Sequence, residues 1–412
     1  AGPGALPEGC APRLLPPPRA HHAADWNGVR LGPACFNGST GSGGEDHHVF
    51  VIGDWGGVIE VQGRGPKTAD HRSLHFPGHH RKFVTGADDL AQQRVAEQMR
   101  QRASKLRLDY VLNAGDSFYW GGIEAPCGAP LGCVGCDPVG QWGPIFEDMY
   151  SGDSLADKQW FGVLGNHDYG GFSFTGGWDQ IIGYTWGGPL SSGRWMVPAQ
   201  YWSASVYYQD DRGPWSVDYF FVDSNVHGAQ EKHTNQGHNI CSLKHNGVNA
   251  TCGAQGPVSL DDCPRWFQRL WVEQVRWLHD ALEKSEAEWQ VVVTHYPPEF
   301  AKDEWRYLAA HGIDLLITGH RHNQEVHGPA DPENFLSPTS YVVSGGGGGI
   351  TSESLPEQAG EDDAYGFMDL TMSRQSIMIE AISHGGHLRQ RAKVWPRAAR
   401  NAAAGLGMDR FV

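Results

Sequence analysis

Five short apolar runs constrain the fold of this chain most, because a polar residue of a type that binds metal ions follows each of them. The runs lie in VFVIGD, YVLNAGD, WFGVLGN, WQVVVTH and IDLLITGH, and the polar residues are Asp54, Asp116, Asn166, His295 and His320. Runs this apolar are typical of strands buried on both faces. Ligands of open α/β sheets bind beyond the carboxyl ends of the strands. We therefore expect these five side chains to lie together at one edge of a sheet.

The segments between these runs indicate that strands alternate with helices. Residues 88–105 and 264–285 have helical periodicity. Residues 201–209 and 215–224 are predicted to form a β-hairpin. Three further strands are predicted over 339–349, 364–373 and 374–383. This order of elements is typical of a layered α/β domain.

Composition excludes several classes of partner. The 412 residues are 40% hydrophobic and 19% charged, so most of the chain is expected to fold around a core. The formal net charge of −15 leaves no basic field for nucleic acid or anionic lipid. No apolar run approaches the roughly 18 residues that a membrane-spanning helix needs. We expect neither nucleic-acid binding nor a membrane span.

The eight cysteines lie in stretches rich in Gly, Pro and Asn, which favours disulfides that join loops in an oxidising compartment. Glycosylation sequons at Asn37 and Asn249 indicate the same surroundings. Cys133-x-x-Cys136 is also compatible with half of a zinc site, although the second pair of ligands that a closed site needs is missing. We expect a secreted or lumenal protein whose signal peptide has been removed.

The side chains at and near the ends of the apolar runs outnumber the ligands of one metal ion. They comprise two carboxylates, a phenol, an amide and four imidazoles, from Asp54, Asp116, Tyr119, Asn166, His167, His295, His320 and His322. One ion takes three or four such ligands, so the set favours two ions bridged by a carboxylate such as Asp116. Two ions about 3.5–4 Å apart clamp the attacking and departing oxygens of phosphoester hydrolysis. That reaction is the chemistry we predict.

Tyr119 indicates which metal is present. A free phenol has a pKa near 10, so it binds as an anion at acidic or neutral pH only where a strongly Lewis-acidic ion displaces its proton. Tyr119 therefore favours Fe(III) at one of the two positions.

The blocks GDWGG, GDSFYWGG, GNHD, VVTHYP and GHRHN, in this order, resemble the five motifs of the purple acid phosphatases within the calcineurin-like metallophosphoesterase superfamily. FEDMYS and GFMDLTMS are most similar to the tartrate-resistant, animal-type branch, and the resemblance extends over about residues 48–388. It implies an α/β fold in which two mixed β-sheets pack as a sandwich flanked by α-helices.

Position by position, the resemblance implies two ligand sets. The Fe(III) ligands would be Asp54, Asp116, Tyr119 and His322. The ligands of a divalent Fe, Zn or Mn would be Asp116, Asn166, His295 and His320. His167 would be a catalytic hydrogen-bond donor to the substrate or leaving oxygen, and Asp116 would bridge the two metals.

The activity implied is that of an acid phosphatase, which hydrolyses small phosphate monoesters by attack of a metal-bound hydroxide and releases inorganic phosphate. Two alternatives stay open. One is a phosphodiesterase or nucleotide hydrolase on the same scaffold, since fold and metals do not set the ester class. The other is a non-hydrolytic protein that binds iron or phosphate.

The chain departs from the animal-type branch at the substrate side. That branch has a second phosphate-binding His a few residues after the fourth-block ligand, whereas no His follows His295 before His311. Glu299, Lys302 or a His within 71–80 are the candidates to replace it.

Other residues near the blocks have more than one interpretation. Asp168 either orients His167 or caps its loop. Gly345–Gly349 are expected to form a tight loop against the metal site. We name three tryptophans as candidates for the pocket mouth: Trp120, Trp178 and Trp186.

Three regions are predicted along the chain. Residues 1–46 are rich in Pro and Gly and lack helical or strand periodicity, which predicts an extended arm held by Cys10 and Cys35. Residues 47–390 form the catalytic domain, and 391–412 form a C-terminal extension.

Overall fold

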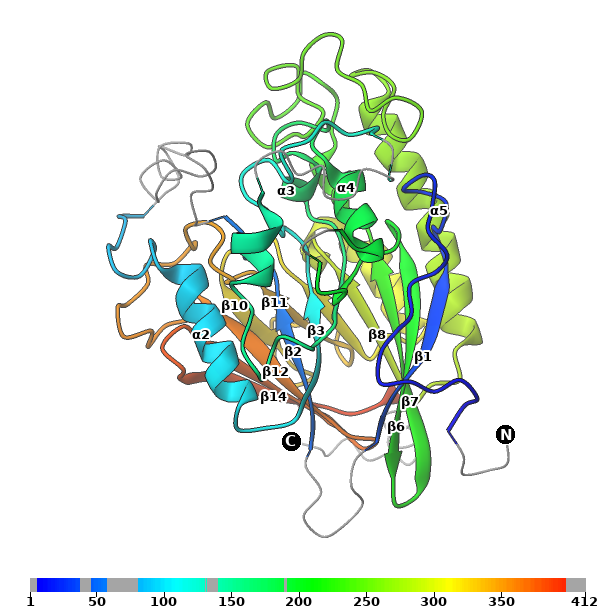
Figure 1. Cartoon of the computed structure of the whole chain (residues 1–412), viewed down its shortest axis with the longest axis vertical. Coiled ribbons are helices and arrows are strands. Elements are labelled where there is room, and N and C mark those ends of the chain that lie inside the picture. The colour runs from blue at the N-terminus through cyan, green and yellow to red at the C-terminus, as the bar shows by residue number, and fades with distance from the viewer. Residues whose placement is uncertain are drawn as a thin grey trace.

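The computed structural model describes residues 6–37, 46–57, 81–129, 131, 140–188 and 191–397. Two mixed sheets of seven strands each pack face to face, and helices cover their outer faces (Figure 1). The predicted sandwich is thereby confirmed.

The first sheet has the strand order β1-β6-β7-β8-β9-β11-β10. Its central strands β7, β8, β9 and β11 are parallel, and β6 joins β7 as an antiparallel hairpin. The bounds are β1 Arg30–Asn37, β6 Trp202–Asp210, β7 Gly213–Val222, β8 Trp289–Thr294, β9 Leu315–Thr318, β10 Gln324–His327 and β11 Ser340–Ser344.

The second sheet has the order β14-β13-β12-β2-β3-β4-β5. Strands β2 to β5 are parallel, and β12 to β14 complete the sheet as an antiparallel meander. The bounds are β2 His47–Ile52, β3 Leu108–Asn113, β4 Trp160–Gly162, β5 Trp195–Met196, β12 Gly366–Met372, β13 Ile377–Ser383 and β14 Leu388–Val394.

Alternate residues of the buried strands fill different layers. Val49 and Val51 of β2 point into the core between the sheets, where Val291 of β8 also lies. Phe50 and Ile52 face the other way and belong to a second buried cluster. This alternation explains why the strands are apolar at every position, since both faces of each sheet are covered.

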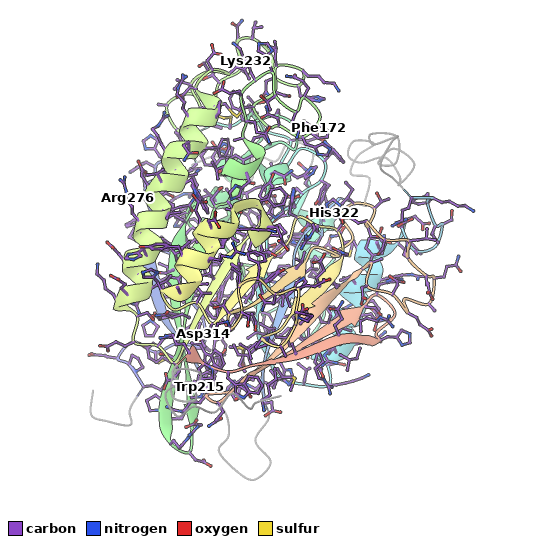
Figure 2. The ribbon with its side chains drawn as sticks, turned by 180° about the vertical axis from the view of Figure 1, so that it is seen from behind. Phe172, Trp215, Lys232, Arg276, Asp314 and His322 are labelled. Atoms are coloured by element: carbon purple, nitrogen blue, oxygen red, sulfur yellow. A yellow bond between two sulfur atoms is a disulfide. The ribbon has the colours of Figure 1, made fainter. Side chains whose placement is uncertain are left out.

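Helices of different lengths cover the outer faces. The helix α2 (Ala91–Ala103) packs Val95 and Met99 into the outer layer of the second sheet. The long helix α5 (Cys263–Lys284) and the short α6 (Lys302–Ala310) lie on the first sheet (Figure 2). Leu278 and Leu308 are buried there. Two shorter helices follow β4, namely α3 (Asn166–Tyr169) and α4 (Trp178–Gly183).

The helices predicted over 88–105 and 264–285 are confirmed by α2 and α5, and the predicted hairpin by β6 and β7.

The N-terminal arm was only partly predicted. Arg30–Asn37 form the edge strand β1, parallel to β6, although the sequence shows no strand pattern there. The register shifts between Leu31 and Ala34 around Pro33, a residue that sheets tolerate at an edge. The β14 strand also continues the sheet past the predicted boundary at 390, to Val394. The division into three regions otherwise stays a prediction.

Among the described residues the cysteines form three disulfides, as predicted, although Cys35 lies in β1 and Cys263 begins α5 rather than a loop. Cys10 pairs with Cys35 and ties the arm to β1. The pairs Cys127–Cys252 and Cys241–Cys263 fasten the long connection between β7 and α5. Cys133 and Cys136 lie outside the described residues, so the zinc alternative for them stays untested.

None of the helices in the described part of the chain has the length and hydrophobicity needed to cross a bilayer.

Candidate metal centre

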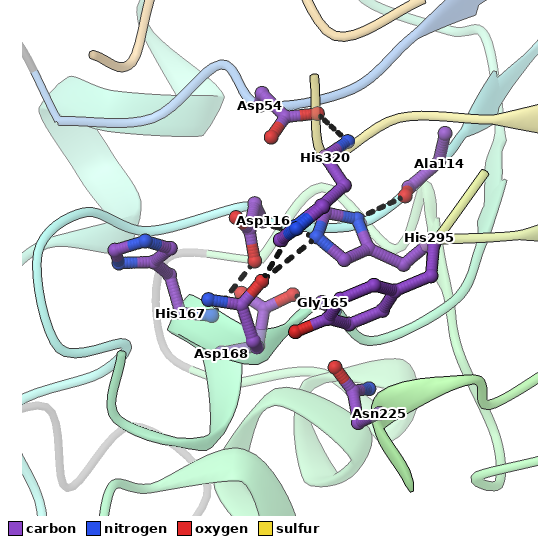
Figure 3. Close-up of polar contacts among 12 residues, drawn as sticks. Asp54, Ala114, Asp116, Gly165, His167, Asp168, Asn225, His295 and His320 are labelled. Atoms are coloured by element: carbon purple, nitrogen blue, oxygen red, sulfur yellow. Dashed lines mark hydrogen bonds and ion pairs between the residues drawn. The ribbon is translucent and has the colours of Figure 1, made fainter. Parts of the chain in front are cut away.

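The five strand ends meet as predicted, but they belong to two facing sheets and not to one edge of a single sheet. Asp54, Asp116 and Asn166 follow β2, β3 and β4 of the second sheet, while His295 and His320 follow β8 and β9 of the first. Parallel pairing of Ile52 with Asn113 brings the first two loops side by side. The two sets of loops meet where the sheets face each other (Figure 3).

One group of side chains surrounds the hydroxyl of Tyr119. This hydroxyl lies 2.9 Å from Oδ1 of Asp54 and 2.8 Å from Oδ2 of Asp116, and its one hydrogen is within reach of both acceptors. Nε2 of His322 lies 3.4 Å from the same hydroxyl and 3.5 Å from Oδ1 of Asp54. These four residues are the ones that the resemblance assigns to Fe(III).

A second group surrounds the amide oxygen of Asn166. Its Oδ1 lies 3.1 Å from Nε2 of His295 and 3.0 Å from Nδ1 of His320. Nε2 of His295 also lies 3.4 Å from Oδ2 of Asp116. These four residues are the ones that the resemblance assigns to the divalent metal.

Asp116 belongs to both groups through one atom. Its Oδ2 contacts Tyr119 on one side and His295 on the other, whereas Oδ1 accepts the backbone N–H of His167 at 2.7 Å. The carboxylate is completely buried, and the hydrogen bond to Oδ1 fixes its orientation. Oδ2 is therefore held between the two groups of candidate ligands.

The loops that carry these residues have an unusual backbone. Asp54, Asp116 and His320 have φ angles of 59°, 51° and 69°, in the left-handed region that side chains other than glycine rarely adopt. Asn235, at 39°, is the remaining non-glycine residue of this kind in the described chain, and it lines the cavity at the site. Such conformations gather where function requires a particular geometry.

Glycines allow the loops to approach one another closely. A Cβ on Gly165 would lie 2.1 Å from Oδ1 of Asp116, and one on Gly349 would lie 2.5 Å from the ring of Tyr119. The expectation that Gly345–Gly349 form a tight loop against the site is confirmed, since Gly349 also donates its N–H to the carbonyl of Asp54 at 2.8 Å.

Asp168 caps the loop and does not bond to the side chain of His167. Its carboxylate accepts the N–H groups of Ser117 and Gly165, at 2.9 and 2.8 Å, and thereby joins two ligand loops. Nδ1 of His167 instead lies 2.5 Å from the carbonyl oxygen of Trp120, to which it donates. Within the described residues the hydrogen bond of the His167 ring uses Nδ1, and the residue lines the cavity.

Burial and neighbouring charge shift the pKa values of the site. Burial, with the Asp116 and Asp54 carboxylates, raises the pKa of Tyr119 well above its ordinary value. Burial alone would lower the pKa of His295, but Asp116 raises it to about 9. Burial and the charge of His295 lower the pKa of His320. Because its pKa is raised, the Tyr119 phenol keeps its proton unless a strong Lewis acid displaces it.

The donor atoms need a cation among them. His295 donates Nδ1–H to the Ala114 carbonyl at 2.8 Å. If the ring carries no second proton, the lone pair of its Nε2 points at the oxygens of Asn166 and Asp116, which also carry lone pairs. A proton or a metal ion between these atoms removes the repulsion. Ligand atoms of Asp54, Asp116 and His295 lie within 4.8 Å of one another, and mixed oxygen and nitrogen ligands suit transition metals. The residues present therefore fit a metal centre.

A cavity of about 340 Å³ opens over the site. Asn166, His167, His320 and His322 line one part of it. The loops that contain Phe172 and Lys232 rise above His322 (Figure 2).

Of the three candidate tryptophans only Trp120 lies beside the site, and it is not among the residues that line the cavity. Trp120 packs edge-on against His167, with ring centroids 4.7 Å apart. Trp178 is completely buried in the core, and Trp186 donates to the carbonyl of Pro17 at 2.8 Å. The prediction for these two was wrong, because nearness in sequence to a ligand block did not bring them to the cavity.

Two candidates for the missing His lie elsewhere. Glu299 accepts hydrogen bonds from Arg321 and Tyr341, at 3.2 and 3.0 Å, and Lys302 lies over the ring of Phe335. Neither lines the cavity. The histidines within 71–80 lie outside the described residues.

The cavity is lined by polar residues that the sequence analysis did not name, among them His227, Tyr296, Gln230, Asn235, His238 and Glu353. His227 follows β7, and its Nε2 is buried with no hydrogen-bond partner among the described residues. Tyr296 lies next to His295 in sequence, and its ring packs on His320 with centroids 3.9 Å apart. Asp223, not His227, directly follows β7, so the strand-end rule does not predict His227.

The family model for calcineurin-like phosphoesterases matches residues 47–324, which include every residue of the two ligand groups. The chain belongs to this family. Purple acid phosphatase 7 of Arabidopsis thaliana is 25% identical over 328 residues, covering 74% of this chain and 81% of that protein. Tartrate-resistant acid phosphatase type 5 of Homo sapiens is 22% identical over 397 residues, covering 91% and 99%. The resemblance indicated by the motifs is confirmed.

Comparison with solved structures supports the fold alone. The structure described as GAP50, the anchor in the inner membrane complex of Plasmodium, superposes with a TM-score of 0.53 at 17% identity. The alignment covers 87% of this chain and 95% of that one.

The shared position of Asp116 predicts the effect of removing its charge. Asp116→Asn keeps the side-chain volume, so we expect the fold to persist while metal content falls from about two ions per chain to below about one. Metal analysis of the purified variants measures this. Asp157→Asn, at a side chain that is 70% exposed, is the control. Full metal content in Asp116→Asn would show that the carboxylate is no bridge.

Proposed function

We propose that this protein is an acid phosphatase that hydrolyses phosphate monoesters at a dinuclear centre of Fe(III) and a divalent Fe, Zn or Mn. The observation that carries the proposal is the single atom Oδ2 of Asp116, which contacts both ligand groups. A bridging ligand is what a pair of ions requires. When bound, such a pair supplies Lewis acidity and an acidified water for hydrolysis.

The proposal of Fe(III) rests on Tyr119. Its pKa is raised by burial and by two carboxylates, so only a strongly Lewis-acidic cation would take the proton's place on the phenol oxygen. The second group offers two imidazoles, an amide oxygen and the shared carboxylate, which suits a divalent ion.

His167 is placed to hold a proton for the leaving oxygen. Nδ1 is engaged by the Trp120 carbonyl, so Nε2 is the nitrogen available to the cavity. A protonated Nε2 would donate to the departing alkoxide of the ester, as a general acid does. The backbone bond from His167 to Asp116 ties this group to the shared carboxylate.

His227 and Tyr296 take the place of the second His of the animal-type branch. Burial lowers the pKa of His227 to about 4, so the ring is neutral above that pH and offers one N–H donor. The Tyr296 side chain lines the same cavity and provides a hydroxyl donor. Together they would bind the phosphate or the leaving group of the substrate.

We place the protein in a secreted or lumenal compartment. The three disulfides support an oxidising environment. Asn249 lies in an exposed turn, accessible to glycosylation, whereas the Asn37 sequon extends outside the described residues.

Monoester specificity predicts a difference between two chromogenic substrates. Phosphate monoesters carry a second anionic oxygen that the metals and cavity donors can bind. We expect kcat/KM for p-nitrophenyl phosphate to exceed that for bis-p-nitrophenyl phosphate by at least about a hundredfold. Steady-state kinetics on metal-replete protein tests this. Preference for the diester would favour the phosphodiesterase alternative, and inertness toward both would favour a non-hydrolytic protein.

The cavity residues predict a loss of substrate binding without loss of metal. In His227→Leu and Tyr296→Phe we expect kcat/KM for p-nitrophenyl phosphate to fall roughly 10- to 100-fold, the effect of losing a hydrogen bond to a charged group. Metal content should stay at the wild-type level. The exposed His233→Leu provides the control. Wild-type kcat/KM in both cavity variants would show that His227 and Tyr296 do not contribute to substrate binding.

A further inference from the structure

A second cluster of metal-binding residue types lies on the outer helices. His279 and Glu283 are one turn apart on α5, and His311 follows the last residue of α6. One ligand atom from each of the three lies within 4.8 Å of the other two. Packing of both helices on the first sheet, through Leu278 and Leu308, brings the three side chains together.

Hydrogen bonding fixes which nitrogen of His311 is free. Nδ1 lies 2.7 Å from the carbonyl oxygen of Tyr307, so it donates there and Nε2 carries the lone pair. A backbone carbonyl behind an imidazole is a common outer-shell arrangement of metal-binding histidines. The ring of His311 faces that of His279, with centroids 4.6 Å apart.

His279 is oriented by its neighbours on α5. Its Nε2 lies 3.6 Å from Oε1 of Glu283, and Nδ1 lies 3.7 Å from Oδ1 of Asp280. Ligand atoms of a tetrahedral zinc site with bonds of 2.0–2.1 Å are about 3.3 Å apart. The Glu283 side chain is 57% exposed and free to make the small movement required.

We propose that His279, Glu283 and His311 form a second, separate binding site for a divalent transition metal of the zinc type. Two imidazoles and one carboxylate are a ligand set that zinc uses with a fourth position left for water or another ligand. Magnesium and calcium prefer oxygen ligands alone, so the two imidazoles select against them.

The surroundings leave room for the fourth ligand. Glu283 and His311 line a cavity of about 620 Å³, which also contains the side chains of Gln290 and Arg306. Gln290 is 1% exposed, and its Oε1 has no hydrogen-bond partner among the described residues. Arg306 is paired with Asp303 at 3.2 Å, which offsets its repulsion of a bound cation.

None of the three residues lines the cavity over the candidate metal centre. Binding at this second site is therefore measurable separately from phosphatase activity, and it does not depend on the proposed function.

Equilibrium dialysis against Zn²⁺ at pH 7.5, on protein already loaded at the metal centre, tests the proposal. Wild type should bind one zinc ion more than His279→Ala/His311→Ala. The single variant Glu283→Gln should weaken this binding at least about tenfold, the loss that even an outer-shell change causes. His387→Ala, at an exposed position before β14, should bind like wild type.

Equal zinc uptake by wild type and the double variant would overturn the proposal. Wild-type affinity in Glu283→Gln would also overturn it, because the exposed carboxylate contributes little to folding and its loss acts only through the metal. Circular dichroism and phosphatase activity, both expected to be unchanged in these variants, show that a loss of zinc does not come from unfolding.

Discussion

The structure depends on one buried carboxylate that two groups of side chains share. Oδ2 of Asp116 contacts Tyr119 and His295, which come from different sheets, and Oδ1 is held by the backbone of His167. A buried anion between two groups of ligands is stable only where cations or hydrogen-bond donors surround it. The loops of both sheets therefore have to meet at this atom, and their backbone conformations follow from that requirement.

Bringing the loops of both sheets together at Asp116 requires strained backbone conformations. Asp54, Asp116 and His320 adopt left-handed conformations, which cost of order 1–3 kcal/mol each. Glycines at 165 and 349 let neighbouring loops pass where a Cβ would collide with Asp116 or Tyr119. Bonds from bound metal to these side chains would offset the strain, so a stable fold and a metal-binding site are linked.

The sequence predicted the parts of the structure that repeat a local rule. The apolar runs predicted the central strands, and the residues at and near their ends predicted which side chains meet at the candidate metal centre. The edge strand β1 was missed because Pro33 and an irregular register remove its pattern. The substrate side was predicted least well. His227 lies in the turn Asn225–Gly228, past the end of β7, so the rule for strand ends does not reach it. Glu299 and Lys302 contact Arg321 and Phe335, which are distant in sequence, so the sequence around them did not predict these contacts.

The visible absorption spectrum of metal-replete protein, measured beside Tyr119→Phe, tests the central claim most directly. The phenol contacts both carboxylates assigned to one metal, so a phenolate on Fe(III) should give a broad charge-transfer band. We predict that wild type is coloured and that the band disappears in Tyr119→Phe. A colourless wild type that contains zinc or manganese, or a band that persists in the variant, would contradict the assignment of Fe(III) to Tyr119.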